Sequence, residues 1–386
     1  MNKNRKTLLG LILVAFVAVA SYFAWRNSQE KTPEDKKVIK IGVIMPQTGF
    51  LSSPGNNVIK GINLYFEEFQ KEHPDKQIEL IFEDSKSDPK IGVNAINKLI
   101  EIDGAKLIIG DIGSPILLAM APIAEKNRVV LISPGASNPK VRDAGDYIFR
   151  IYTSDEFDGR VMANYLISRK KVESVALLYF NNDYGIGLSK SFEEAYNAQG
   201  GHISLAYSFE DSRVDFREII LKIKKQEIRD LYFIGSPKQN ASFLKQLKEL
   251  GCTSNVYGVL SFEDSEFLNI ALNSFDSVIY TTPYFDLNDG RDVVEKFKKS
   301  FMQKYGEVPD LQSALGYDVA NIIALALSNS GFEEESVKEE LYKIQNFFGI
   351  TGRISFDQAG DVKKDILLKR VNGSGETRIL EILSVN

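Results

Sequence analysis

The sequence is poor in the residues on which metal and covalent chemistry depend. Its 386 residues include one cysteine, Cys252, and two histidines, His73 and His202. A single cysteine excludes an intrachain disulfide, a dithiol motif and a thiolate zinc site. Two histidines leave almost no material for a histidine metal site or a histidine general base. We therefore expect no metal and no cofactor.

Signatures of catalysis are missing as well. The sequence contains no Walker motif, no Gly-x-Ser-x-Gly elbow and no His-Glu-x-x-His. Its net charge of −5 gives no reason to expect a nucleic acid as a partner. Hydrophobic residues make up 44% of the chain, which is enough for an ample core. A length of 386 residues exceeds one ordinary domain, so we expect about two.

The N-terminus is typical of an exported protein. Residues 1–6 are basic, residues 7–25 are almost wholly apolar, and Ala20 fits the end of a cleaved secretory signal. The apolar run continues past Ala20, however, and at about 18 residues it just reaches spanning length, so an uncleaved membrane anchor is the alternative. No cysteine lies nearby, which rules out a lipoprotein anchor. We predict a signal peptide or anchor over 1–25, a polar linker over 26–37, and export of the remainder.

From residue 38 onward, apolar runs of strand length alternate with segments of helical periodicity. Two such series follow each other, over residues 38–152 and 153–282. The predicted fold class is therefore α/β, with two doubly wound parallel-sheet lobes that face each other across a cleft. Three helical stretches and a hairpin around Asn372-Gly373 follow. Segments 46–57 and 181–187 are predicted as a loop and a turn because of their glycines and polar residues.

The stretch 106–138 holds the strongest candidate for a ligand site. One helical crossover joins two apolar runs, 106–110 and 129–133, so they form parallel strands that end at one edge of a sheet. Ligands of open α/β sheets bind at that edge. Ser114, followed by proline, predicts a helix N-cap whose free N–H groups favour an anionic or strongly accepting group. Singly, Ser114 is best explained as a cap and 133–137 as a turn, but together they favour a binding site.

Two other patterns have ordinary explanations. Gly185 to Lys190 follows a strand and opens a helix, as a dinucleotide fingerprint would, but Lys190 replaces the third small residue. We favour a glycine-rich turn that points Tyr184 into the cleft. Glu263 and Asp264 follow a predicted strand and face the same cleft, yet no nucleophile accompanies them, so an acid/base pair is the lesser alternative.

Seven motifs, in this order, carry a resemblance to a known family. They are IGVIMPQTG (41–49), FEDSKSDP (82–89), IGDIGS (109–114), ISPGASNP (132–139), DYGIG (183–187), GYDVA (316–320) and FDQAGD (356–361). With them the chain resembles, over residues 38–383, the type I periplasmic binding proteins. The similarity is to the branch of leucine/isoleucine/valine-binding proteins that serve ABC importers.

The resemblance implies two lobes joined by three crossovers, near 150–154, 281–285 and 350–356. Lobe one then takes 38–152 plus 284–353, and lobe two takes 153–283 plus 354–386. Such proteins close around a ligand like a hinged clamp, which excludes water and strengthens polar contacts.

The resemblance also implies the ligand-binding residues. The carboxylate-binding half of the family pattern matches Ser114 and the turn of Gly135, Ala136 and Ser137. The departure lies in the ammonium-binding half, because the family's aromatic residue matches Ser236 and its acidic residue matches Leu260. The predicted ligand-binding residues are Phe50, Ser114, Gly135, Ala136, Ser137, Tyr152, Tyr184, Ser236, Leu260, Ser261 and Glu263, and Asp264 is the alternative to Glu263 as the replacement for the family's acidic residue.

A buried ammonium group without a carboxylate partner is expensive, on the order of several kcal/mol. We therefore expect either that Glu263 or Asp264 substitutes or that the ligand is a small carboxylate or amide instead of an ordinary amino acid. The expected function is a non-enzymatic, exported solute-binding protein that delivers this small molecule to an ABC permease. The alternatives are a sensory receptor domain anchored by residues 7–25 and a Rossmann-type enzyme with NAD at 185–190.

Overall fold

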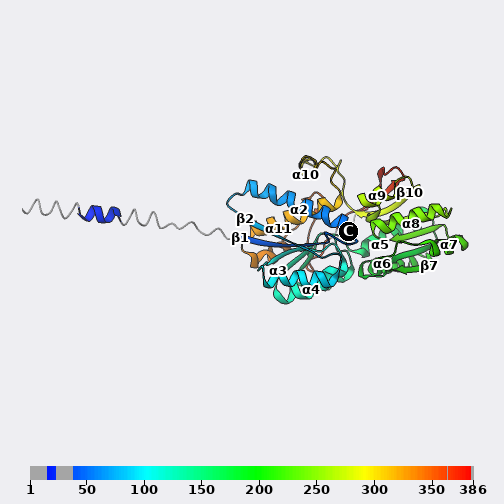
Figure 1. Ribbon diagram of the computed structural model, residues 1–386, viewed down its shortest axis with the longest axis horizontal. Coiled ribbons are helices and arrows are strands. Elements are labelled where there is room, and N and C mark those ends of the chain that lie inside the picture. Colours follow the sequence, from blue (N-terminus) through cyan, green and yellow to red (C-terminus); the bar gives the residue numbers. More distant parts are fainter. Residues whose placement is uncertain (1–14, 23–37, 363, 384–386) are drawn as a thin grey trace, which may run out of the picture.

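The computed structural model describes residues 15–22, 38–362 and 364–383. Apart from an exposed helix over 15–22, these residues form two α/β lobes that lie side by side (Figure 1). The predicted linker 26–37 lies outside the described residues, as does the predicted signal or anchor except for that helix.

The sheet of lobe one consists of five parallel strands in the order β2-β1-β3-β4-β5. The strands are β1 (Val38–Met45), β2 (Gln77–Asp84), β3 (Leu107–Gly110), β4 (Val130–Ser133) and β5 (Ile148–Arg150). Every residue of β3 and β4 is buried, because helices cover both faces of a doubly wound sheet.

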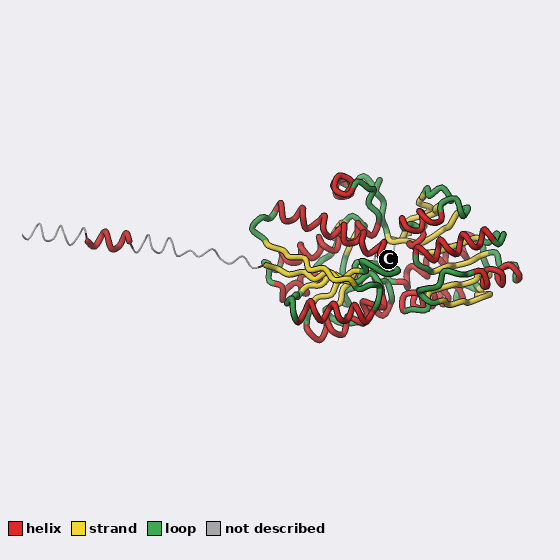
Figure 2. The backbone as a smooth tube through the Cα atoms, viewed as in Figure 1, coloured by secondary structure: helices red, strands yellow, loops and turns green. Residues whose placement is uncertain are grey.

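Helices pack on both faces of this sheet (Figures 1 and 2). One face carries α2 (Ser52–Glu72) and α11 (Leu311–Asn329), with α10 (Asp292–Tyr305) outside them, and the other carries α3 (Pro89–Glu101) and α4 (Ser114–Asn127). Among the described residues, α11 is the one helix long and apolar enough to span a membrane, but 78% of it is buried. It is therefore a core helix.

The sheet of lobe two has seven strands in the order β14-β13-β10-β9-β8-β6-β7. They are β6 (Ser174–Phe180), β7 (His202–Phe209), β8 (Asp230–Ile234), β9 (Asn255–Val259), β10 (Ser277–Pro283), β13 (Ile366–Asn372) and β14 (Thr377–Leu383). Strands β6 to β10 are parallel and repeat the order found in lobe one, which confirms the predicted repeat of two βα series. The predicted hairpin pairs antiparallel with β10, so this sheet is mixed.

The remaining elements complete both lobes. Those of lobe two are α5 (Asp155–Asn164) with a π-helical end (Tyr165–Lys170), α6 (Asp183–Asn197), α7 (Arg217–Lys225), α8 (Pro237–Glu249), a 3₁₀ turn (Leu260–Phe262) and α9 (Ser265–Ala271). Those of lobe one and the hinge are two 3₁₀ turns (Pro139–Asp143 and Glu334–Ser336), α12 (Val337–Tyr342), β11 (Phe347–Gly349) and β12 (Gly352–Ile354).

Two predicted loops are wrong in part. Residues 52–57 begin α2, because Pro54 lies in the first turn, where proline is tolerated. The predicted turn 181–187 is helical from Asp183, and Asn182 caps the helix by accepting a hydrogen bond from the Gly185 N–H at 3.0 Å. The glycines of the dinucleotide-like pattern therefore lie within α6 and form no phosphate-binding loop.

The third predicted crossover also needs correction. Phe356 and Val362, assigned to lobe two, belong to the hydrophobic core of lobe one. The chain therefore leaves lobe one after Val362 and enters lobe two at β13. The other two lobe boundaries stay predictions; β10 ends at Pro283, and Phe285 is already packed in the core of lobe one.

Candidate ligand-binding site

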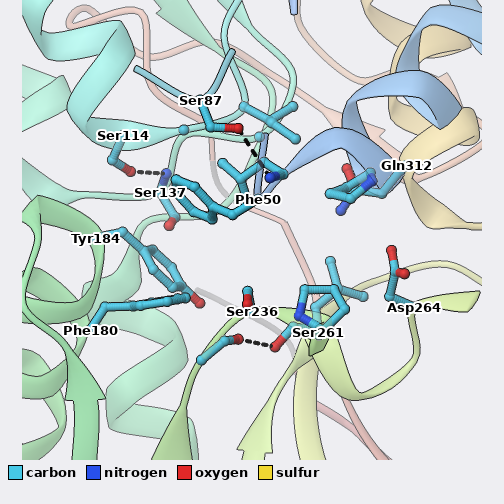
Figure 3. Close-up of a pocket in the computed structure, with 18 of the residues that line it drawn as sticks. Phe50, Ser87, Ser114, Ser137, Phe180, Tyr184, Ser236, Ser261, Asp264 and Gln312 are labelled. Atoms are coloured by element: carbon cyan, nitrogen blue, oxygen red, sulfur yellow. Dashed lines mark hydrogen bonds between the residues drawn. The ribbon is translucent and has the colours of Figure 1, made fainter. Parts of the chain in front are cut away.

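A cleft of about 1310 Å³, its solvent-filled mouth included, lies between the lobes. Both lobes contribute walls, as Figure 3 shows for Ser114 and Ser137 on one side and Ser236 and Ser261 on the other. The lining residues are Phe50, Leu51, Pro54, Ser87, Pro89, Ile112, Gly113, Ser114, Pro115, Ile116, Gly135, Ser137, Tyr152, Phe180, Asn182, Tyr184, Asp211, Gly235, Ser236, Pro237, Leu260, Ser261, Glu263, Asp264, Asp310, Leu311 and Gln312.

The topology explains why the cleft lies there. The carboxyl ends of the parallel strands in both lobes point toward it, and the helices that follow begin at its wall. The N-cap residues of six helices line the cleft, namely Leu51 (α2), Gly113 (α4), Asn182 (α6), Ser236 (α8), Asp264 (α9) and Asp310 (α11). Each N-terminus carries a partial positive charge of about half an elementary charge, so the walls favour electron-rich groups.

All but one of the residues predicted to bind ligand line this cleft: Phe50, Ser114, Gly135, Ser137, Tyr152, Tyr184, Ser236, Leu260, Ser261 and Glu263. Ala136 is the exception. It is fully buried beneath the turn, and its N–H donates to the Ser133 Oγ at 2.8 Å. The position of Ala136 is therefore structural.

Ser114 is not the helix N-cap that the sequence predicted. The N-cap of α4 is Gly113, and the Ser114 Oγ instead accepts hydrogen bonds from the N–H groups of Ser137 and Asn138, each at 3.2 Å. These two bonds occupy both oxygen lone pairs, so the hydroxyl proton of Ser114 is left to be donated. A ligand oxygen in the cleft is a suitable acceptor for it.

The N–H groups of the turn after β4 are engaged within the protein. Gly135 and Ala136 donate to the Ser133 Oγ, and Ser137 and Asn138 donate to the Ser114 Oγ. Hydroxyl groups, and not the N–H groups of this turn, are therefore the donors that this corner offers to a ligand.

Aromatic and aliphatic side chains form the middle of the cleft. The ring centroids of Phe50, from lobe one, and Phe180, from lobe two, lie 6.3 Å apart, and those of Phe180 and Tyr184 are also 6.3 Å apart. Leu260 and Leu311 extend this apolar surface. Such a wall accommodates an apolar ligand body between polar ends.

The polar side chains of lobe two are mostly satisfied within the lobe. The Ser236 Oγ accepts a hydrogen bond from the Gln239 N–H and so caps α8. The Ser261 hydroxyl donates to the Gly235 carbonyl at 2.6 Å and accepts from the Asn240 side chain at 2.8 Å.

Four carboxylates line the cleft, and each has a partner. Asp264 caps α9 and accepts from the Ser53 hydroxyl at 3.0 Å, while Asp310 caps α11 and binds the Asn57 amide. Asp211 accepts from the Asn182 side chain at 2.8 Å. Glu263 is ion-paired with Lys369, which is buried behind it. No lysine, arginine or histidine is among the described lining residues.

Contacts between the lobes bridge the rim. The Ser53–Asp264 bond joins α2 to the start of α9. Asn138 donates to the Asp183 carbonyl, and Lys140 lies 3.3 Å from the Asp183 carboxylate. The Asp264 carboxyl, which accepts from Ser53 in the first of these contacts, is itself buried, and burial raises its pKa to about 6.

Three further carboxyl groups are buried near the cleft. Burial raises the pKa of Asp155 to about 8, although the Ser137 hydroxyl counteracts this, and it raises the pKa of Asp158 to about 6. Asp111, which accepts from the Gly113 N–H at 2.7 Å, has its pKa raised by burial to about 7.

Several residues that line the cleft were not predicted from the sequence. Phe180, Asn182 and Asp211 stand at or just after strand ends, so the rule that located Ser114 also applied to them. Asp310 and Gln312 begin α11, which follows no strand of lobe one, and their place in the cleft depends on how that helix packs.

Two α/β lobes with an interlobe cleft at their strand ends define a binding protein of the two-lobe, type I class. The comparisons with known proteins identify the family. A family profile described as "periplasmic binding protein" matches residues 38–376, so the chain belongs to this family. Its relatives place it in the leucine/isoleucine/valine-binding branch.

One similar protein is the leucine-, isoleucine-, valine-, threonine- and alanine-binding protein of Pseudomonas aeruginosa. It is 24% identical over 356 residues, which cover 91% of this chain and 92% of that protein. The structure of the leucine-binding protein LivK from Thermotoga maritima is 28% identical, with a TM-score of 0.84 over 90% of this chain and 99% of the other. A solute-binding protein from R. palustris, solved in complex with benzoate, is 18% identical with a TM-score of 0.84 over 90% of this chain and 98% of that one. The last similarity shows the fold alone.

These relatives are solute-binding proteins, which are not enzymes, and this chain is likewise a non-enzymatic solute-binding protein of the ABC transporter type. Membership of the family implies a small-molecule ligand and a location outside the cytoplasm.

Proposed function

We propose that this protein delivers a small carboxylate- or amide-bearing solute to an ABC importer and holds it in the interlobe cleft by hinged closure. The observation that carries the proposal is the chemistry of the cleft walls. The Ser114 hydroxyl has a proton to donate at one end, an apolar middle follows, and the four lining carboxylates are already engaged.

The proposed binding mode has two parts. A ligand carboxylate or amide oxygen accepts from the Ser114 hydroxyl, close to the start of α4. The apolar part of the ligand lies between Phe50, Phe180 and Tyr184. Closure removes water from these contacts, which strengthens them.

Calorimetric titration with two panels tests the ligand class. One panel contains amino acids, including leucine and valine, and the other contains the corresponding carboxylic acids and amides. We expect members of the second panel to bind more tightly. Tight binding of leucine that survives both Glu263→Ala and Asp264→Ala would contradict the proposal. Mass spectrometry of small molecules that co-purify with the protein would identify the natural ligand.

A second candidate function is a ligand-sensing receptor domain held to the membrane by residues 7–25. The observation in its favour is that the apolar run continues beyond Ala20. N-terminal sequencing of the exported protein distinguishes a chain that begins at Ser21 from one that retains Met1. Permease and ATPase genes beside this gene would favour transport, whether or not the protein is anchored.

A further inference from the structure

Glu263 is the cleft carboxylate best placed to meet a ligand ammonium group. Asp264 and Asp310 accept hydrogen bonds as helix N-caps, and Asp211 is held by Asn182. The Glu263 side chain keeps 23% of its surface exposed, on the cleft side of lobe two. The charge preference of the lobe-two side of the cleft therefore depends on Glu263.

A buried lysine already neutralises Glu263. The Lys369 Nζ, on β13, lies 2.8 Å from one Glu263 carboxylate oxygen and 3.1 Å from the other. Lys369 is only 5% exposed. It does not line the cleft, so it acts on a ligand only through Glu263.

The surroundings of the pair favour this arrangement. The buried Tyr280, on β10, lies near Glu263: burial and then the charge of Glu263 raise its pKa well above the usual value. Its hydroxyl therefore stays neutral. A buried lysine is stable when it is paired and hydrogen-bonded, which Glu263 provides here.

We propose that Lys369 sets the charge selectivity of the cleft, so that Glu263 accepts an uncharged donor, such as a hydroxyl or an amide N–H, and disfavours an ammonium group. A carboxylate has about four acceptor positions, and Lys369 occupies two of them, which leaves positions for a neutral donor. An ammonium group at the same carboxylate would bring a second positive charge beside Lys369, and like charges repel in a site from which water is excluded. The ligand class is therefore a carboxylate or amide with a neutral donor in the position where an amino acid carries its ammonium group.

This inference rests on the proposed function for the identity of the site, but its test is separate. The probes are matched pairs in which a hydroxyl replaces the ammonium group, leucine with 2-hydroxy-4-methylpentanoate and phenylalanine with 2-hydroxy-3-phenylpropanoate. The measured quantity is the ratio of the two dissociation constants within each pair, by calorimetry at pH 7. A purely structural role of Lys369 would change both constants together and leave the ratio alone.

Lys369→Met should free the Glu263 carboxylate and shift the ratio toward the amino acid by about tenfold or more, the value of one charge-assisted hydrogen bond. In the double variant Glu263→Gln/Lys369→Met, this shift should disappear. Arg169→Met is the matched control, because it removes a cation from an exposed pair with Glu381 that is not part of the cleft.

The single variant Glu263→Gln provides an independent readout if Lys369→Met does not fold. It leaves the Lys369 charge unpaired and should shift the ratio toward the carboxylate. An unchanged ratio in the folded variants overturns the inference, even where the wild type binds carboxylates as proposed. If the wild type binds no probe but Lys369→Met gains amino-acid binding, the inference stands and the proposed ligand class fails.

Discussion

Ser114 shows how one hydroxyl can serve the fold and the ligand at once. Its oxygen holds the turn after β4 through two N–H groups, and its proton remains for a ligand. The same reasoning separates Ser114 from Ser261, whose proton is already donated to the Gly235 carbonyl. Two serines of the same cleft therefore differ in whether their hydroxyl proton is available to a ligand.

Ser114→Ala should weaken binding of a carboxylate ligand by about 10- to 100-fold, the loss of one hydrogen bond to a charged group. Ser114→Thr retains the hydroxyl and should recover most of the affinity. Ser242→Ala makes the same chemical change on the outer face of α8, where the hydroxyl bonds to the Lys238 carbonyl. Calorimetry with the tightest-binding carboxylate measures the effect, and equal affinities for Ser114→Ala and the Ser242→Ala control would refute it.

The buried carboxyl groups predict how stability depends on pH. The folded-state pKa of Asp155 is about 8 and that of Asp111 about 7, against an ordinary value of 3.8. Between the ordinary pKa of 3.8 and the raised pKa of each group, the folded state therefore holds more protons than the unfolded state. The free energy of unfolding falls as the pH rises through this range. The slope is about 1.4 kcal/mol per pH unit for each group that differs by one proton. The melting temperature should accordingly drop between pH 6 and pH 8.

Asp155→Asn tests this assignment, because the amide cannot ionise. Its melting temperature should vary less between pH 6 and pH 8 than that of the wild type. The control is Asp357→Asn, which removes a partly exposed carboxyl. Burial acts to raise the pKa of Asp357, but the bond to Arg142 and the backbone N–H groups of Ala359 and Asp361 together lower it. A wild-type melting temperature that rises between pH 6 and pH 8 would show that the buried carboxyl groups do not determine the pH dependence of stability.

At the scale of elements, the crossing of α2 and α11 positions one wall of the cleft. Both helices begin at the cleft, and glycines allow their backbones to approach. A Cβ on Gly61 would lie 1.9 Å from the Ser313 carbonyl oxygen, and one on Gly316 would lie 2.1 Å from the Val58 carbonyl oxygen. Since these contacts are with backbone atoms, a larger residue forces the helices apart.

Gly316→Ala should therefore destabilise the protein by about 1–3 kcal/mol, the usual cost of overpacking a close contact. It should also weaken ligand binding, because Asp310 and Gln312 at the start of α11 would move. Gly331→Ala is an unsuitable control because Gly331 has a φ of 67°. Ala326→Gly, deeper in the same helix, loses about 1 kcal/mol of helix propensity without adding volume. Urea denaturation compares the two, and a Gly316→Ala variant as stable as the wild type would exclude the clash.

At the scale of the whole molecule, an ion pair joins two segments that lie next to predicted crossovers between the lobes. Arg150, at the end of β5, is fully buried and binds Asp361 through two bonds of 2.6 Å each. A third bond connects Arg150 to the Asn138 carbonyl in the turn after β4. The segment at Asp361 and the turn after β4 therefore share one buried cation.

Asp361→Asn should lower the free energy of unfolding by about 3–5 kcal/mol, because it leaves Arg150 buried without its counter-charge. Glu381→Gln removes one partner of the exposed Arg169–Glu381 pair and should cost about 1 kcal/mol or less. Chemical denaturation followed by circular dichroism measures both variants. Similar losses in the two would mean that Arg150 and Asp361 do not act as a buried charge pair.

The sequence by itself determined the succession of strands and helices along the chain, the repeat of two βα series and the strand ends that meet at the cleft. Hydrophobic periodicity and strand-end residues such as Ser114 are local signals, so they can be predicted without coordinates. The resemblance located a minority of the lining residues in the same way, since its motifs follow strands.

Only the tertiary structure decided which groups are free to act. That the turn N–H groups are occupied by serine hydroxyls, that Lys369 neutralises Glu263, and that Gln312 reaches the cleft all depend on contacts between distant segments. The helical starts of α2 and α6 were misjudged because proline and glycine, which locally favour loops, also suit the first turn of a helix. Local pattern specifies where the strands end, but hydrogen-bond satisfaction and charge pairing are set by packing across the whole fold.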